Sequence, residues 1–356
     1  MKRALVVAGT FGLVFAGASA QQGRQERTAP GIYSRDFTRQ VRDAVDRGLA
    51  WLAAKQNPNG SWNCKIGYKL YEDYHGEDGE DVGVTSLACM AFVGAGHTPN
   101  RGKYGRVVAK GLNFILSCVR EEDGYITANG SRMYTHAFAT MFLAEIYGMS
   151  KRPDVKEKLK RSVDLLVAAQ NKEGGWRYQP IPVDADISVT VSVLQGLRGA
   201  RNTGISVPSD TIERAMRYIK GCATNYGFNY QRADDYTFND TRVTFPLTAC
   251  GVVAHYSAGV YNGREVQNGL RYLQDNRNRL WYGKYHYFYG HYYCAQAMYM
   301  AGPSYWESYY PRVRDEIMAQ QKPEGCWQDD VGRTYATAMA CIVLQMPCEW
   351  LPLFQK

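Results

Sequence analysis

An aromatic residue in a loop after an amphipathic helix pattern recurs six times along this chain, about every 50 residues. The six positions are Trp62, Tyr125, Trp176, Phe228, Trp281 and Trp327. A repeat of this length is typical of stacked or ring-closed pairs of elements, in which each pair buries its apolar face only against its neighbours. The period therefore constrains the architecture, although it leaves the chemistry open.

Each repeat combines two helix patterns of different character. In residues 41–52, apolar residues recur every three or four positions and charged residues occupy the other face, which predicts an outer helix. Residues 82–95 are apolar or small on nearly every side, as in a helix that is buried all round. The same alternation predicts the pairs 104–119 with 134–148, 154–170 with 186–200, 210–222 with 242–257, 262–275 with 289–301, and 305–321 with 333–346.

Six such pairs predict an all-α fold, a single (α/α)6 toroid over residues 37–356. An open solenoid is the alternative, but ring closure removes the exposed ends that a solenoid has to cap.

Three stretches, residues 47–62, 169–176 and 319–327, carry glutamine, then glycine, then tryptophan at similar spacing. Glycine just past a helix end permits the left-handed backbone that stops the helix, and the indole that follows can cover the helix terminus. This pattern resembles the QW repeat of squalene cyclases. The wider superfamily also contains prenyltransferase β subunits and complement thioester domains, so the resemblance implies an α/α toroid while function diverges.

In a closed ring of alternating helices, all inner helices run in the same direction. Their amino-terminal ends gather at one rim with unpaired N–H groups and partial positive charge. Polar and aromatic residues at these starts are therefore predicted to line one mouth: Tyr134, His136, Arg242, Tyr289, His291, Tyr292, Tyr293, Arg333 and Tyr335.

The segment Asp184-Ala-Asp186 resembles the DxDD segment of squalene–hopene cyclases. The resemblance implies that Asp186 is the proton donor that starts cyclisation and that Asp184 supports it, while Ile187 replaces the final acid. From the residues alone, the simpler explanation is that both aspartates are helix caps or first-turn acids that face the helix dipole.

No metal or other cofactor is expected. Resemblance to the protein prenyltransferases would imply a zinc ion held by an Asp-x-Cys motif, but the fourth predicted inner helix begins with Asp240-Thr-Arg242 instead. The Cys-Gly-Glu-Gln run of the thioester relatives is also absent from the sequence.

Residues 1–20 have a basic start, an apolar stretch and a small-residue cleavage site, which predicts a signal peptide and an exported protein. Residues 21–36 are expected to be a flexible segment. In an exported chain nine cysteines indicate disulfides, for which Cys64, Cys118, Cys222 and Cys326 are the better candidates.

The net charge is +8, but acids and bases are interleaved, which disfavours a nucleic-acid partner. A mean hydropathy of −0.40 argues against membrane spans and leaves peripheral membrane contact open.

The leading hypothesis is an exported toroid whose pocket binds an isoprenoid or other apolar ligand. As an enzyme it would be squalene-cyclase-like and acid-initiated rather than a zinc-dependent prenyltransferase. A non-catalytic periplasmic toroid that binds a protein or envelope partner is one alternative. A carbohydrate-active barrel is another, and it would need two carboxyl groups across the pocket, with Asp81, Asp184 and Asp186 as candidates.

Overall fold

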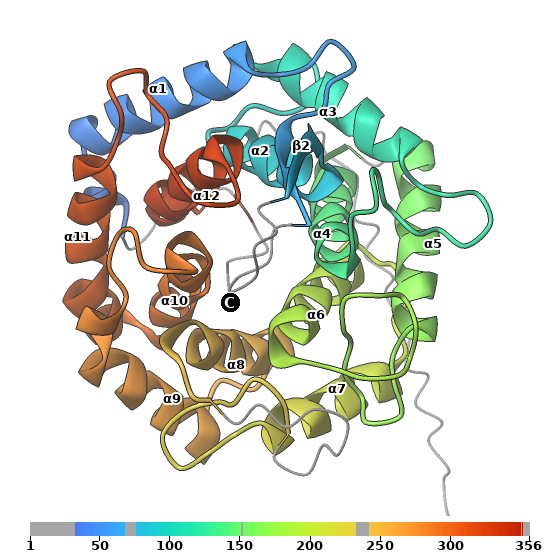
Figure 1. Ribbon diagram of the computed structural model, residues 1–356, viewed down its shortest axis with the longest axis vertical. Helices are drawn as coiled ribbons and strands as arrows, with labels where there is room; N and C mark the ends of the chain where they lie inside the picture. The colour runs from blue at the N-terminus through green and yellow to red at the C-terminus, as the bar shows by residue number, and fades with distance from the viewer. Residues whose placement is uncertain (1–32, 68–75, 151, 233–241, 350, 352–356) are drawn as a thin grey trace, which may run out of the picture.

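The computed structural model describes residues 33–67, 76–150, 152–232, 242–349 and 351. The predicted signal peptide, most of segment 21–36, and Asp240 lie outside these residues. Within the described chain, twelve α-helices form two concentric rings (Figure 1). This confirms the predicted all-α toroid.

The outer ring is formed by α1 (Arg39–Ala54), α3 (Gly105–Ser117), α5 (Pro153–Ala168), α7 (Ser209–Gly221), α9 (Arg264–Asp275) and α11 (Pro303–Ala319). The inner ring is formed by α2 (Val82–Gly94), α4 (Met133–Ser150), α6 (Ile187–Asn202), α8 (Phe245–Ser257), α10 (Tyr287–Ala301) and α12 (Arg333–Gln345). Each inner helix packs against the next, and α12 packs against α2, so the ring is closed. Three short 3₁₀ turns, η1 (Ser34–Asp36), η2 (Arg277–Arg279) and η3 (Met346–Cys348), complete the helical elements.

Burial follows the two helix patterns. Every residue of α2 is buried, whereas α9 buries only Val266, Gly269, Leu270 and Leu273 along one stripe. A helix without a polar face is stable only when it is covered all round, and this is why the apolar member of each pair is the inner one.

The three glutamine–glycine–tryptophan copies join each repeat to the next. In each copy the indole N–H donates to a carbonyl in the last turn of the preceding outer helix: Trp62 to Leu52, Trp176 to Leu166 and Trp327 to Ile317. The glutamine amide donates to the loop glycine and to an early carbonyl of the following outer helix: Gln56 to Val107, Gln170 to Thr211 and Gln321 to Ala44. Because Ala44 belongs to α1, the last copy closes the ring.

Two of the degenerate copies are shifted by one residue from the predicted aromatic. Trp281 is 50% exposed, and Leu280 takes the buried place beside Gly290. In the second repeat the backbone N–H of Ile126, rather than that of Tyr125, is bound by the inner helix. Aromatic character alone therefore did not identify the anchor residue.

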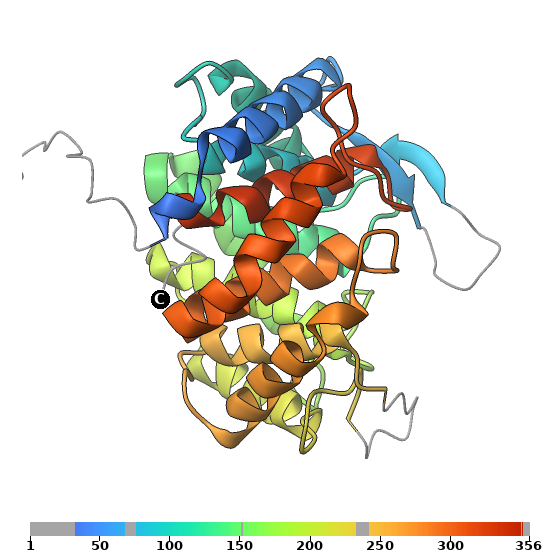
Figure 2. The ribbon, with the colours of Figure 1, turned by 90° about the vertical axis from the view of Figure 1, so that its left-hand side faces the viewer.

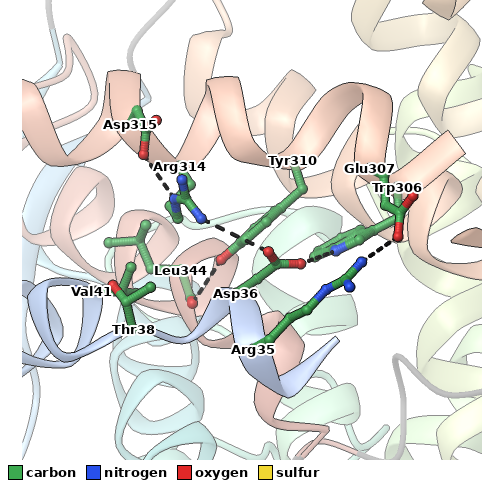
Figure 3. A network of polar contacts seen from close by, with 10 residues as sticks. All are labelled: Arg35, Asp36, Thr38, Val41, Trp306, Glu307, Tyr310, Arg314, Asp315 and Leu344. Carbon is green, nitrogen blue, oxygen red and sulfur yellow. Dashed lines mark hydrogen bonds and ion pairs between the residues drawn. The ribbon is translucent and has the colours of Figure 1, made fainter. Parts of the chain in front are cut away.

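A two-stranded antiparallel hairpin, β1 (Asn63–Ile66) with β2 (Glu77–Glu80), lies on the face where the inner helices begin. On the opposite face (Figure 2), η1 packs on α11. There the Asp36 carboxylate accepts a hydrogen bond from the Trp306 indole at 2.8 Å, and Tyr310 donates to the Leu344 carbonyl (Figure 3). Residues 33–36 thus belong to the folded ring and not to a flexible segment.

No disulfide is formed among the nine cysteines, all of which lie in the described residues, and seven of them are buried. The predicted bridge candidates Cys64, Cys222 and Cys326 serve as compact core residues instead, as free cysteine commonly does. No helix in the described part of the chain has the length and apolar character to cross a membrane.

Candidate functional site

Asp186 immediately precedes α6 and caps it. Its Oδ1 accepts hydrogen bonds from the Val189 backbone N–H at 2.9 Å and from the Ser188 hydroxyl at 2.5 Å. The side chain is fully buried. Its Oδ2 has no hydrogen bond of normal geometry with the described residues, although the Tyr230 phenol is near enough to favour the charged form.

Burial raises the pKa of Asp186, and this effect outweighs the hydrogen bonds from Ser188 and Val189 and the nearby Arg177 charge, which lower it. The carboxyl group therefore keeps its proton to a higher pH than an exposed aspartate does. The same donors stabilise the carboxylate once the proton has left. This combination suits a proton donor.

Asp184 does not contact Asp186 and does not cap α6. Its carboxylate forms an ion pair with Arg177 at 3.2 Å. The Arg177 guanidinium lies over the rings of Tyr178 and Tyr230, 5.2 and 5.8 Å from their centroids. Arg177 also faces Asp186, so the charges of both aspartates act on this one arginine.

Tyr178 and Tyr230 are site residues that the sequence reasoning missed. Their hydroxyl groups lie 2.5 Å apart beside Asp186. A signal for them exists, because each stands two residues after its repeat anchor, Trp176 or Phe228. The residues two places after the other anchors are Cys64, Ala128, Tyr282 and Asp329.

Four predicted mouth tyrosines do meet inside the ring. The hydroxyl of Tyr134 on α4 donates to the Ser188 hydroxyl, and that of Tyr289 on α10 donates to the Ser188 carbonyl at 3.2 Å. Tyr293 bonds to Ser192 of α6 at 2.8 Å. Tyr292 extends to α4, where its hydroxyl meets the Met141 sulfur at 3.6 Å and its ring meets Phe138. The interior between α4, α6 and α10 is thus lined with phenol rings.

The structure corrects the placement of the two histidines. His136 Nδ1 accepts from the Ile126 N–H at 3.0 Å, and its Nε2 lies 3.1 Å from the Ser162 carbonyl of the outer helix α5. His291 Nδ1 lies 2.7 Å from the Tyr309 hydroxyl of α11. Both rings therefore lie between the inner and outer helices rather than at the mouth.

The remaining predicted residues lie at the rim. Arg242 is exposed ahead of α8, which begins only at Phe245, and Arg333 is exposed and bonds to Gln328 and Glu324. Tyr335 is half-buried and close enough to Tyr292 and Asp329 for their charges to act on it.

Asp329 is a second carboxyl group that the sequence reasoning missed. Burial raises its pKa to about 6, so it titrates close to neutral pH. It follows the anchor Trp327 by two residues, as Tyr178 follows Trp176.

The chain was compared with known families, sequences and structures. No family model matches the chain. Over 154 residues it is 25% identical to the lanosterol synthase of Mus musculus, a match that covers 40% of this chain and only 19% of the length of that relative. Among solved structures, the type II terpene cyclase MstE from Scytonema, in complex with its substrate geranylgeranyl dihydroxybenzoate, aligns with a TM-score of 0.60 at 11% identity over 90% of this chain and 99% of that one.

The cellobiose 2-epimerase of Spirochaeta thermophila DSM 6192 aligns with a TM-score of 0.65 at 13% identity, over 89% of this chain and 97% of that one. At these identities the structural likenesses establish the fold alone. The chain is thus similar in fold to the type II terpene cyclases, and over a short stretch it is similar in sequence to lanosterol synthase.

Among the described residues, no three His, Cys, Asp or Glu side chains gather closely enough to hold a metal ion.

Proposed function

We propose that this protein binds an isoprenoid or related apolar ligand at the mouth of the toroid, and that Asp186 donates the proton that starts its conversion. One observation carries the proposal. Asp186 is a fully buried carboxyl group with one oxygen held by two donors and the other without a regular partner, beside the phenol rings of Tyr178 and Tyr230.

In the proposed step the π electrons of a ligand double bond take the proton from Asp186 Oδ2. The O–H bond breaks, a C–H bond forms, and a carbocation and a carboxylate result. The faces of aromatic rings attract positive charge, so the phenols around Asp186 suit this intermediate. A neighbouring carbon then loses a proton, which returns through water to the Asp186 carboxylate; the product is a neutral isomer of the ligand, and no net change in composition occurs.

The size of the molecule agrees with this proposal. Squalene cyclases, which the sequence resembles, enclose their substrate between two such domains, and the described chain forms one ring. The Scytonema enzyme is described as a type II terpene cyclase, and 99% of its chain aligns with this single toroid. One ring of this size is therefore enough for such an enzyme.

The test compares Asp186→Asn with Asp81→Asn, because Asp81 caps α2 as Asp186 caps α6. Each protein is incubated with polyprenyl probes, including geranylgeranyl dihydroxybenzoate, and the products are analysed by mass spectrometry. We expect an isomer of unchanged mass from the wild type and from Asp81→Asn. We expect a loss of about 100-fold or more from Asp186→Asn. Full activity of Asp186→Asn would reject the role of Asp186.

The capping geometry also favours a second candidate, a non-catalytic toroid that binds a protein or envelope partner. Helix capping alone is sufficient reason to bury an aspartate at this position. In that case no probe is converted, and the two Asn variants differ from the wild type only in stability. A sugar-converting role is less favoured, since it would need two carboxyl groups across a pocket, whereas Asp81 caps α2 and Asp184 forms an ion pair with Arg177.

A further inference from the structure

The helix starts of α2 and α6 are near copies of one another. Their sequences are Asp-Val-Gly-Val-Thr at residues 81–85 and Asp-Ile-Ser-Val-Thr at residues 186–190. In both, the buried aspartate caps the helix through the N–H three residues on, at 2.8 Å in α2 and 2.9 Å in α6. In both, the threonine hydroxyl accepts a hydrogen bond from the backbone N–H of the anchor tryptophan. Because the frames match, the main chemical difference is Gly83 in one copy and Ser188 in the other.

In α2 the glycine leaves room for the neighbouring inner helix. A Cβ atom on Gly83 would lie 3.0 Å from Thr135 Cα. Thr135 occupies this space and directs its hydroxyl to Asp81 Oδ2 at 3.4 Å, while the Val84 N–H binds Oδ1. The two oxygens of Asp81 are thus bound by separate donors.

In α6 the serine reverses this arrangement. The Ser188 hydroxyl and the Val189 N–H both donate to Oδ1 of Asp186, and Oδ2 has no donor of regular geometry among the described residues. Ser188 in turn accepts from the Tyr134 hydroxyl, and its own carbonyl accepts from Tyr289. The hydrogen bonds run in one direction, from Tyr134 through Ser188 to Asp186.

An oxygen that accepts two hydrogen bonds is a poor place for a proton. The acid proton of Asp186 therefore belongs on Oδ2. We propose that Ser188 is a positioning residue that, backed by Tyr134, holds Oδ1 of Asp186 as an acceptor and keeps the transferable proton on Oδ2. This inference rests on the proposed function for its catalytic meaning, but not for its test.

Other groups face the same carboxyl from each neighbouring element. They are Arg177 with its partner Asp184, the phenols of Tyr178 and Tyr230, Tyr134 on α4 and Cys250 on α8. A substitution at Ser188 removes none of these groups, and Ser188→Ala changes one of their contacts, because the Tyr134 hydroxyl loses its acceptor; Tyr134→Phe measures that part separately. The change in Asp186 titration can therefore be attributed to the lost donor.

The experiment is a ¹³C NMR titration of the aspartate carboxyl groups, with the Asp186 signal assigned by its absence in Asp186→Asn. We expect Ser188→Ala to raise the titration midpoint of Asp186 by about one pH unit, since a donor to the charged form is lost. Ser188→Thr keeps the hydroxyl and is expected to restore the wild-type midpoint. Tyr134→Phe is expected to raise it by less, because the serine hydroxyl remains.

Thr135→Val is the matched control in the other copy. It removes the hydroxyl that faces Asp81 and is expected to move the midpoint of Asp81 but not that of Asp186. An unchanged Asp186 midpoint in Ser188→Ala overturns the inference. If Ser188→Ala does not fold, an unchanged Asp186 midpoint in Tyr134→Phe overturns the inference instead.

The titration needs no substrate, so its result is separate from that of the proposed function. If the wild-type protein converts no probe, the proposed function is rejected. The titration midpoints of Asp186 still show whether Ser188 positions the proton. Where turnover is found, the alkaline limb of kcat is expected to move upward with the midpoint in Ser188→Ala and to return in Ser188→Thr.

Discussion

His136 fills a place that threonine fills in four other repeats. There the hydroxyls of Thr85, Thr190, Thr248 and Thr337 accept the backbone N–H of the repeat anchor. His136 does the same through Nδ1, and its second nitrogen reaches the outer helix α5. Such a histidine must remain neutral, because Nδ1 can accept only in the unprotonated form.

We expect His136→Thr to make the protein less sensitive to acid. Burial lowers the pKa of His136 to about 4 from its ordinary 6.5. Below pH 6.5 the unfolded chain binds a proton that the native state does not bind, so stability falls as the pH drops from 6.5 toward 4. The loss is up to about 3 kcal/mol. Urea unfolding at pH 4, 5, 6 and 7 measures it, and threonine still accepts the Ile126 N–H.

His97→Thr serves as the control, since His97 is only half-buried and a smaller part of the proton cost is expected there. If the free energy of unfolding falls equally with pH in the wild type and in His136→Thr, this imidazole is already charged, or exposed, in the native state.

The loop glycines act at the scale of whole elements, because each lets a loop contact the next outer helix directly. Gly174 has a φ of +101°, and a Cβ atom there would overlap the Arg214 carbonyl oxygen of α7. The same contact recurs at Gly60 with α3 and, less closely, at Gly325 with α1. Glycine at these positions thus meets both a backbone demand and a packing demand.

We expect Gly174→Ala to cost about 3 kcal/mol or more, since left-handed strain adds to a clash with backbone that has no room to move. Gly204→Ala isolates the strain, because Gly204 has a φ of +92° and a Cβ atom there would meet nothing within 4 Å. It is expected to cost about 1 kcal/mol. Denaturant midpoints measure both, and equal costs would contradict the packing argument.

Helix order and type were predictable, because the 3.6-residue periodicity and the alternation of amphipathic and apolar stretches follow directly from burial. The helix boundaries were less predictable. Residues 242–244 were predicted to be helical, but the helix begins only after the Thr244 cap, with Pro246 in its first turn. At the site, Asp186 and four of the tyrosines were found from their place at helix starts. Tyr178 and Tyr230 were not, because periodicity says nothing of where a loop side chain points.

At the scale of the molecule, ring closure joins the two ends of the sequence. Gln321 donates to Ala44 as Gln56 and Gln170 donate to the helices that follow them. Asp36 then binds Trp306 of α11 from the other side of the junction. The first and last repeats are thereby joined by the same type of glutamine contact as internal repeats.

The nine cysteines are spread over the whole fold, so their redox state concerns the whole molecule. Only Cys118 and Cys348 are partly accessible. We expect a maleimide reagent to label no more than these two quickly in the native protein, and all nine after unfolding without reductant. Intact mass spectrometry counts the adducts. Fewer than nine would reveal bridges that the fold does not contain.

The same measurement bears on export, which remains a proposal based on residues 1–20. Protein recovered from outside the cytoplasm should start near Gln21, and its adduct count would show whether buried thiols survive in an oxidising compartment.

The attachment of η1 to α11 also determines on which face of the ring the described chain begins. The turn η1 lies on the face away from β1 and β2 (Figure 2). A sensor chip, bead or fusion partner joined upstream of Tyr33 would attach the protein through the face that carries η1. The end of the ring at which α6 begins would then point into the solution, and a vesicle or ligand carrier would approach that end directly.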